Sequence, residues 1–337
     1  MASKTSQDRR TAHVSHSPRC SVIITAYNVG PYIAEAVESA LIQTERDIEV
    51  IIVNDGSTDD TRERLKELES RWSCDDRPLV VIDQPNKGEA AARNIGIHMA
   101  QAPYVGFLDG DDRWHPTMVE RLVGILDTRS EIDAAHCEIR IIDEHGEDTG
   151  LQGRLTPGRK DFADVLLFRS LGQPSAMITR RSVVEAVGCF DESPGIAAEW
   201  DLWLRIATHR DWNILTVAEV LVDYRRRPQQ LSKNWQKALN YWKVTVEKAK
   251  QRHPELVATL EREAYARRYL HCAALARSAG DNRAALKLIF QAWSRAWPKF
   301  AVEFEAWRKT LGILLCWLPS PVFGALQRST QRPLWRR

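Results

Sequence analysis

Four short apolar runs alternate with three helical stretches in the N-terminal third of the chain, and this alternation constrains the fold more than any other feature. The runs are rich in β-branched residues and nearly continuous, which is typical of strands buried on both faces of a parallel sheet. They span residues 21–26, 49–54, 79–83 and 104–108, and the helical stretches span residues 31–43, 60–72 and 88–102. This order predicts an open, mostly parallel α/β sheet flanked by helices.

The pattern changes twice further along the chain. From residue 132 it becomes mixed, with strands expected at residues 134–143, 175–179 and 213–225 and a helix at residues 200–209. After Trp235 the sequence is helical, with amphipathic segments at residues 236–252, 255–279 and 282–296. We therefore expect a disordered leader at residues 1–18, an α/β domain at residues 19–235 and an all-helical appendage at residues 236–337.

Composition excludes several classes of protein. The chain of 337 residues is 44% hydrophobic and 27% charged, as in ordinary globular proteins, and its net charge of +2 is too small to indicate nucleic-acid binding. Its six cysteines are scattered without a C-x-x-C pair, which argues against a zinc site or a disulfide framework and fits a reducing compartment. The first twenty residues lack an apolar core, and no apolar run is long enough to span a bilayer. We expect a cytoplasmic protein.

Polar residues follow three of the predicted strands at their carboxyl ends, where open α/β sheets bind ligands. The three strand ends read T-A-Y-N at 25–28, V-N-D-G-S-T-D-D at 53–60 and F-L-D-G-D-D at 107–112. Asp109, Asp111 and Asp112 would repel one another unless a cation lay between them. Their hard oxygen ligands suit Mg²⁺ or Mn²⁺, which substrate phosphates commonly help to bind. The alternative is an Asp-rich turn that caps a helix.

Residues 19–232 resemble the inverting family 2 glycosyltransferases of GT-A fold. Besides the three strand ends, four segments carry the resemblance: N-K-G-E-A-A-A-R-N-I-G at 86–96, V-G-C-F-D-E at 187–192, E-W-D-L-W-L-R at 199–205 and Y-R-R-R-P-Q-Q-L-S at 224–232. The resemblance implies transfer of a sugar from a nucleotide-diphospho-sugar, with UDP favoured, to a saccharide or lipid-linked acceptor in cell-envelope or surface polysaccharide synthesis.

The resemblance also implies roles for individual residues in binding the donor. Tyr27 would stack on the nucleobase, Asp55 would accept a hydrogen bond from it, and Asp109 and Asp111 of the D-x-D motif would hold the metal. The implied donor-binding set is Thr25, Tyr27, Asn28, Asp55, Lys87, Gly88, Arg93, Asp109, Gly110 and Arg227. Four of these have structural alternatives: Tyr27 as a packing aromatic, Asp55 as a residue that only shapes the turn with Gly56, Arg93 in a helix-surface salt bridge and Arg227 in a solvated basic turn.

The chain departs from the family pattern at two places, residues 198–199 and residue 227. The family usually places Glu-Asp ahead of the W-D-L-W-L-R segment, and the Asp deprotonates the acceptor. Here Ala198 and Glu199 stand there, so Glu199 is the candidate base and Asp201 the second choice. Trp200 is expected to bind the acceptor sugar. Related enzymes often have His where Arg227 stands; because Arg cannot ligate a cation, it would neutralise phosphate directly.

The C-terminal tail suggests a membrane surface as a further partner. Residues 311–323 are apolar, contain Trp317 and are followed by four arginines. Such a segment can lie peripherally on the anionic inner face of a membrane. Docking of a terminal helix on the helical appendage is the alternative.

Rival functions lack their own motifs in this chain. It has no G-x-G-x-x-G turn after the first strand, as a dinucleotide-dependent dehydrogenase would need, and no G-x-x-x-x-G-K-[ST] loop of a P-loop NTPase. A haloacid-dehalogenase-type phosphatase would carry its Asp pair on the first strand, whereas this chain carries its Asp cluster after the fourth. A sugar-nucleotidyltransferase would carry a glycine-rich loop after the first strand, where this chain has Tyr27 and Asn28. A degenerate transferase domain that acts as a nucleotide-sugar-binding or helical interaction module remains the non-enzyme alternative.

Overall fold

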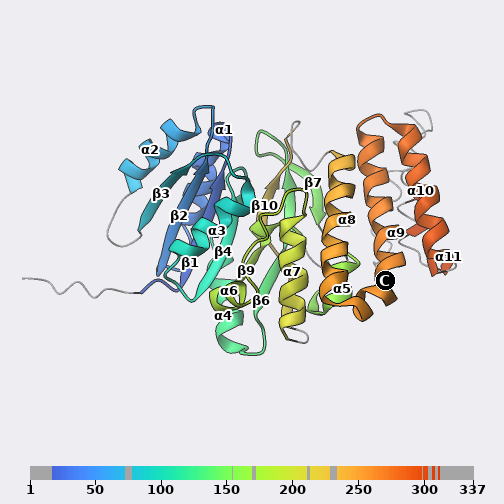
Figure 1. The fold of residues 1–337 in the computed structure, drawn as a ribbon. Coiled ribbons are helices and arrows are strands. Elements are labelled where there is room, and N and C mark those ends of the chain that lie inside the picture. The colour runs from blue at the N-terminus through green and yellow to red at the C-terminus, as the bar shows by residue number, and fades with distance from the viewer. Residues whose placement is uncertain are drawn as a thin grey trace, which may run out of the picture.

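The computed structural model describes residues 17–72, 78–153, 155–168, 172–210, 213–227, 234–297, 299–302, 306–307 and 310–311. These residues form a sheet covered by helices on both faces, with a group of long helices at one end of the molecule (Figure 1). The predicted leader lies outside the described residues except for residues 17–18. The apolar tail segment at 311–323 lies outside them except for Leu311.

The N-terminal half of the sheet is parallel, as the sequence predicts. Its strands are β1 (Cys20–Ala26), β2 (Ile48–Asp55), β3 (Leu79–Gln84) and β4 (Tyr104–Asp109), in the order β3-β2-β1-β4. β1 and β2 are buried along their whole length, which explains their continuous apolar sequence. The register pairs Thr25 with Asp109 and Ala26 with Asn54, so the polar strand ends meet at one edge.

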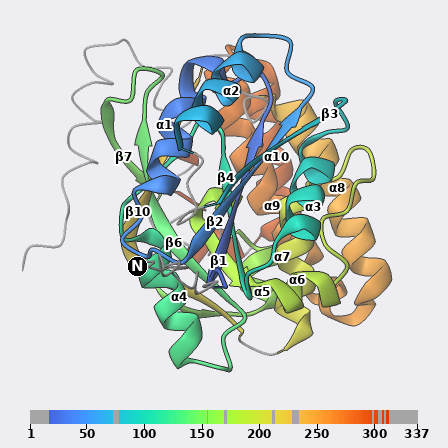
Figure 2. The ribbon, with the colours of Figure 1, turned by 90° about the vertical axis from the view of Figure 1, so that its left-hand side faces the viewer.

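Helices on opposite faces connect these strands. α1 (Gly30–Leu41) packs on one face beside α2 (Thr61–Trp72), and α3 (Glu89–Met99) packs on the other (Figure 2). Successive β1 residues point to the two faces, so Val22 and Ile24 join the core under α1, whereas Ile23 joins the core under α3. Gly96 allows close contact there, because a Cβ at this position would lie 2.3 Å from Ile23 Cγ2.

The rest of the ten-stranded sheet is mixed in direction. β4 continues into β9 (Met177–Arg180), β6 (Ala134–Ile142), β10 (Ile214–Arg225) and β5 (Arg113–Trp114), while β7 (Asp148–Gly153) pairs with β6 and β8 (Gly158–Lys160) with β10. β6 and β10 run parallel, and the other pairs in this half are antiparallel. The predicted α/β fold is confirmed. Residues 175 and 176 of the predicted strand 175–179, however, belong to a 3₁₀ helix, η1 (Pro174–Ala176), which precedes β9.

Four shorter helices complete the α/β part. α4 (Met118–Thr128) packs beside α1, whereas α5 (Phe162–Leu166), α6 (Arg181–Ala186) and α7 (Ala198–His209) pack on the α3 face. Within α7, Trp203 and Leu204 are buried in the core on this face.

The C-terminal helices are α8 (Trp235–Arg252), α9 (Pro254–Ser278), α10 (Asn282–Ala296) and α11 (Lys299–Val302). α9 and α10 form an antiparallel hairpin, with Gly280 at φ 81° in the turn. Buried side chains of α8, including Trp242 and Val246, belong to the same core as α3 and α7. The helical region therefore continues the core of the sheet and adds a second core between α9 and α10. Within the described part of the chain, no helix is both long and apolar enough to cross a membrane.

Candidate active site

Backbone contacts hold the ends of β1 and β4 together. The N–H of Gly110 donates to the carbonyl oxygen of Thr25 (2.9 Å), which fixes the start of the D-G-D-D turn. A Cβ at Gly110 would lie 2.9 Å from the same oxygen, so a side chain there would open the contact. The predicted donor residues Thr25 and Gly110 thus shape the site through their backbone.

The loop after β1 is joined to the loop after β2. Asn28 adopts φ 52°, a conformation that Asn tolerates better than most residues. Its N–H donates to Ser57 Oγ (3.0 Å), and its Oδ1 accepts from the N–H of Thr58 (2.8 Å). The side chain of Asn28 is therefore engaged within the protein, whereas the neighbouring Tyr27 is 48% exposed and free to stack on a planar ligand.

Asp55, at the end of β2, organises the loop before α3. Its Oδ1 accepts from the N–H of Lys87 (2.8 Å) and from Gln84 Nε2 (2.6 Å), and its Oδ2 accepts from the N–H of Gly88 (2.9 Å). Gly88 has φ 93°, which favours glycine at this turn. Asp55 is buried, so it presents Lys87 and Gly88 at the edge, and at most one of its lone pairs remains for a nucleobase.

Arg93 links α3 to the D-x-D motif. Its buried guanidinium donates to Asp109 Oδ1 (2.8 Å), forms an ion pair with Glu89 and lies 5.3 Å from the ring centre of Phe190. Arg93 therefore neither lies on the helix surface nor faces solvent. It holds the carboxylate of Asp109 in place.

Glu89 is a site residue that our sequence analysis did not assign, although it lies in the N-K-G-E segment. The side chain is 56% exposed, yet protein groups crowd around it. This partial desolvation raises the pKa of Glu89 to about 7; Arg93 opposes the shift, and the charges of Asp109, Glu199 and Asp111 add to it. The same interactions show that these carboxylates gather at one place.

We expect Glu89→Gln to raise the melting temperature at about pH 8 without divalent metal, and to change it little at about pH 4. The folded-state pKa lies above the ordinary value of 4.5, so the stabilising contribution of the neutral form is complete below 4.5 and is lost as pH rises through about 7. Thermal unfolding of both proteins across this range tests the expectation. A variant that is less stable than the wild type at alkaline pH would contradict it.

The two remaining aspartates of the D-G-D-D turn have different environments. Asp112 is fully buried; its Oδ2 accepts from Ser175 Oγ (2.6 Å) and its Oδ1 from the N–H of Arg225 (2.9 Å). Burial and the nearby charges of Asp111 and Asp109 raise its pKa well above the usual value. Asp112 thus joins the turn to η1 and β10, which removes it from the cluster of three that the sequence suggested.

Asp111 faces the guanidinium of Arg227. Arg227 Nε lies 2.6 Å from Asp111 Oδ2, and Arg225 Nε donates to the backbone oxygen of Asp111 (2.8 Å). Both guanidinium groups lie within 5.4 Å of the ring centre of Tyr32. Burial raises the pKa of Asp111; the charge of Arg227 opposes this shift, and that of Asp109 adds to it. Arg227 is therefore held at the carboxylate and does not form a solvated turn.

The two candidate bases on α7 also differ. Glu199 is partly buried near Glu89, Arg93 and Arg268, and among the described residues it makes no hydrogen bond or ion pair. Asp201 is fully buried, pairs with Arg205 Nε (2.8 Å) and forms a second ion pair with Arg252 of α8. These contacts favour a structural role for Asp201 and leave Glu199 as the available carboxylate.

Trp200 lies where α7, α8 and the end of α5 meet. Its ring centre is 4.2 Å from that of Phe168 and 6.1 Å from that of Trp242. The indole is half-buried, so one part packs in this aromatic group while another part stays accessible.

Asp109 and Asp111 are the residues that could hold a divalent ion. Within the described ranges, no three His, Cys, Asp or Glu side chains are grouped to bind a metal on their own. Two carboxylates nevertheless fit Mg²⁺ or Mn²⁺, because these ions keep several waters and take substrate phosphates as ligands. Burial and the charge of Asp109 raise the pKa of Asp111, and a bound cation would favour its ionised form.

Ser175, Arg225 and Arg268 are further residues around the site that the sequence analysis missed. Ser175 Oγ accepts from the N–H of Asp109 (3.1 Å) and donates to Asp112, so one hydroxyl orders two aspartates. The Y-R-R-R segment marks Arg225, but no local signal marks Ser175 or Arg268.

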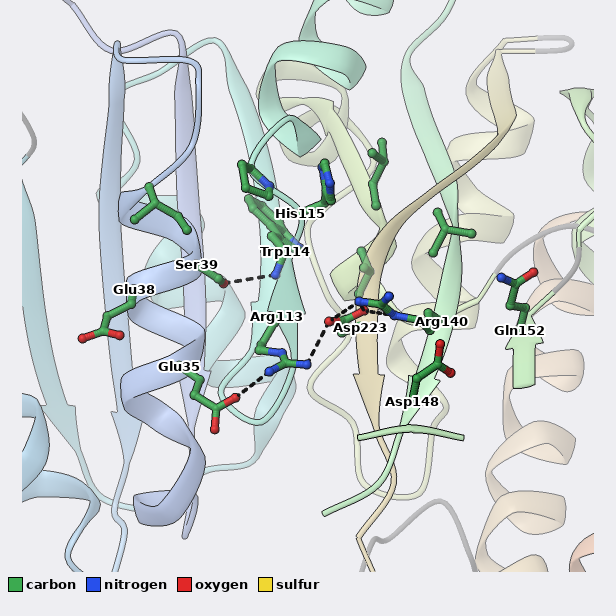
Figure 3. Close-up of a pocket in the computed structure, with 15 residues that line it drawn as sticks. Glu35, Glu38, Ser39, Arg113, Trp114, His115, Arg140, Asp148, Gln152 and Asp223 are labelled. Carbon is green, nitrogen blue, oxygen red and sulfur yellow. Dashed lines mark hydrogen bonds and ion pairs between the residues drawn. The ribbon is translucent and has the colours of Figure 1, made fainter. Parts of the chain in front are cut away.

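A separate cavity of about 730 Å³ lies between α1 and the sheet strands β5, β10, β6 and β7 (Figure 3). Glu35 at its edge accepts from Arg113 (3.0 Å) and, from the other side, from Arg225 (2.8 Å). Asp223 in its wall accepts from Arg113 and Arg140. The cavity thus shares Glu35 with the network around Asp111, while the predicted site residues lie elsewhere.

Comparison with known proteins identifies the family. Residues 21–188 match the model of glycosyl transferase family 2. The chain is 31% identical over 231 residues to TuaG of Bacillus subtilis, a putative teichuronic acid biosynthesis glycosyltransferase, and this match covers 67% of the chain and 87% of TuaG. It is 34% identical over 192 residues to an uncharacterized glycosyltransferase of Nostoc sp., covering 55% of the chain and 56% of that relative.

Solved structures share the fold at low identity. Residues 1–349 of S. aureus TarS, in complex with UDP-GlcNAc, superpose with a TM-score of 0.55 at 16% identity, covering 90% of the chain and 82% of that fragment. The mannosyltransferase PcManGT of Pyrobaculum calidifontis, in complex with GDP-Man and Mn²⁺, superposes with a TM-score of 0.54 at 20% identity, covering 89% and 87%. On its sequence matches and its GT-A fold, the chain belongs to glycosyltransferase family 2.

Proposed function

We propose that this protein transfers a sugar from a nucleotide-diphospho-sugar to an acceptor hydroxyl with inversion at the anomeric carbon. The observation that carries the proposal is the gathering of Glu89, Arg93, Asp109, Asp111 and Glu199 at the carboxyl edge of the sheet. A nucleotide diphosphate needs positive charge beside its phosphates, and a nucleophilic hydroxyl needs a carboxylate to accept its proton; the residues at this edge can meet both needs.

The donor binds along the ends of β1, β2 and β4. Tyr27 stacks on the base, and the loop that Asp55 fixes presents Lys87 and Gly88 to the base or ribose. UDP is the favoured nucleotide. TarS has been solved with UDP-GlcNAc and PcManGT with GDP-Man, so a related fold accommodates either base.

The diphosphate lies next to the D-x-D motif. Asp109, positioned by Arg93, and Asp111 hold Mn²⁺ or Mg²⁺, and the ion when bound stabilises the charge that develops on the leaving diphosphate. Arg227, which touches Asp111, supplies a second positive charge within reach of the phosphates.

Glu199 acts as the general base. It accepts the proton from the acceptor hydroxyl, whose oxygen attacks the anomeric carbon from the face opposite the diphosphate. Trp200 offers an aromatic surface to the acceptor sugar. We propose a saccharide or lipid-linked acceptor in cell-envelope polysaccharide synthesis; the description of TuaG as a putative teichuronic acid biosynthesis glycosyltransferase supports the pathway.

We expect the purified protein to release nucleoside diphosphate from one UDP-sugar in the presence of Mn²⁺ or Mg²⁺, and to stop when EDTA is added. Slow hydrolysis of the donor by water commonly reveals such a site without its acceptor. A panel of UDP- and GDP-sugars with coupled detection of the released diphosphate tests this. A degenerate domain would bind nucleotide in calorimetry but release no diphosphate from any donor, and that result would refute the proposal.

A further inference from the structure

The outermost helix, α10, exposes large apolar side chains on the face turned away from α9. Its buried side is apolar and packs on α9 through residues such as Leu288, Ile289 and Ala292. Figure 1 places α10 at the end of the molecule opposite to β3. The exposed side, here called the α10 face, consists of Arg283, Leu286, Lys287, Phe290, Ser294 and Trp297.

The α10 face is more apolar than ordinary surface. Phe290 is 74% exposed and Trp297 is 63% exposed, which makes them the two most exposed large hydrophobic residues in the described chain. The ring of Trp297 contacts that of Trp293, with ring centres 6.4 Å apart, which extends the apolar surface at this end of α10. A contiguous exposed apolar patch commonly marks a binding surface.

The charge of this region has one sign. Between Asn282 and Val302 the sequence holds Arg283, Lys287, Arg295 and Lys299 and no acidic residue. Arg295 lies over the rings of Tyr265 and Tyr269 in α9, and Lys299 pairs with Glu263. Arg283 and Lys287 therefore supply the charge on the α10 face.

Asp281 is the acidic residue nearest to the α10 face along the chain, and its side chain caps the start of α10. Asp281 Oδ1 accepts from the N–H of Ala284 (2.9 Å) and caps α10. It lies at the end of α10 opposite to Trp297, so aromatic and basic side chains share the α10 face without an acidic neighbour along most of its length.

We propose that the α10 face docks on an anionic lipid bilayer. Phe and Trp side chains enter the boundary between headgroups and acyl chains, while Lys and Arg pair with anionic headgroups. A second copy of the chain fits less well, because a two-fold contact sets this patch against itself and the α10 face carries no acidic residue to pair with Arg283 and Lys287. The surface is distinct from residues 311–323, on which the sequence-based membrane prediction rested.

Sedimentation of the full chain with vesicles tests the proposal. We expect binding to vesicles of phosphatidylcholine and phosphatidylglycerol, weak binding to phosphatidylcholine alone, and loss of binding as salt screens the charges. Phe290→Ser with Trp297→Ser should lower the partition coefficient at least about tenfold. Lys287→Gln and Arg283→Gln should each lower it about fivefold.

The control removes exposed apolar surface elsewhere. Ile42→Ser with Met99→Ser changes two residues that are 55% and 48% exposed at the ends of α1 and α3, and should leave vesicle binding unchanged. Equal binding by the wild type and the Phe290/Trp297 variant would overturn the proposal. So would absent vesicle binding combined with self-association that this variant abolishes. Donor turnover in solution needs no vesicle, so either result leaves the proposed transferase activity standing.

Discussion

Asp111→Asn is expected to lower turnover by about a hundredfold or more, with little change in the melting temperature. The substitution keeps the size of the side chain but removes the charge that faces Arg227 and that we propose to hold the divalent ion. Stability should change little, because burial and Asp109 already disfavour the ionised form, as the raised pKa of Asp111 indicates. Steady-state release of nucleoside diphosphate and thermal unfolding measure the two effects.

Asp281→Asn is a matched control for Asp111→Asn. Asp281 is an exposed aspartate that caps the start of α10, remote from the predicted site residues, and Asn caps a helix about as well. It should leave turnover unchanged. Titration of metal in the presence of nucleotide should show weaker binding for Asp111→Asn only. Near-normal turnover by Asp111→Asn would refute the assignment of the D-x-D motif.

The sequence predicts the sheet well where its pattern is strong. The buried strands β1, β2 and β4 have continuous apolar runs, and α8, α9 and α10 begin and end within two residues of the predicted bounds. β5, β7 and β8 were missed, since short edge strands carry no periodic signal. α4 was missed although its apolar residues at 118, 119, 122, 123 and 126 repeat with helical spacing.

The sequence predicts which residues belong to the site, but not which groups those residues contact. The motifs indicate Asp55, Asp109 and Arg93, yet nothing local shows that Asp55 binds the backbone of residues 87–88 or that Arg93 is buried against Asp109. Such partners lie tens of residues apart and are decided by packing. The Ser175 hydroxyl, which orders two aspartates across the sheet, is the clearest example of a contact that only the fold reveals.

Substitutions of the two carboxylates of α7 are expected to have different effects, one on turnover and the other on the free energy of unfolding. Glu199→Gln is expected to lower turnover by about a hundredfold or more with unchanged donor binding, because an amide cannot accept the acceptor proton. Asp201→Asn should instead lower the free energy of unfolding by about 3 kcal/mol, because it leaves Arg205 and Arg252 without a buried counterion.

The pair is informative because the residues lie on one helix two positions apart. Turnover with saturating acceptor, donor affinity by calorimetry and unfolding in urea should be measured on both variants. If Glu199 is the base, turnover by Glu199→Gln should lose its dependence on a titrating base while its folding stays normal. Should Asp201→Asn retain wild-type stability and lose turnover instead, the roles would have to be exchanged. The ion pairs with Arg205 and Arg252 that now mark Asp201 as structural would then be positioning a catalytic carboxylate.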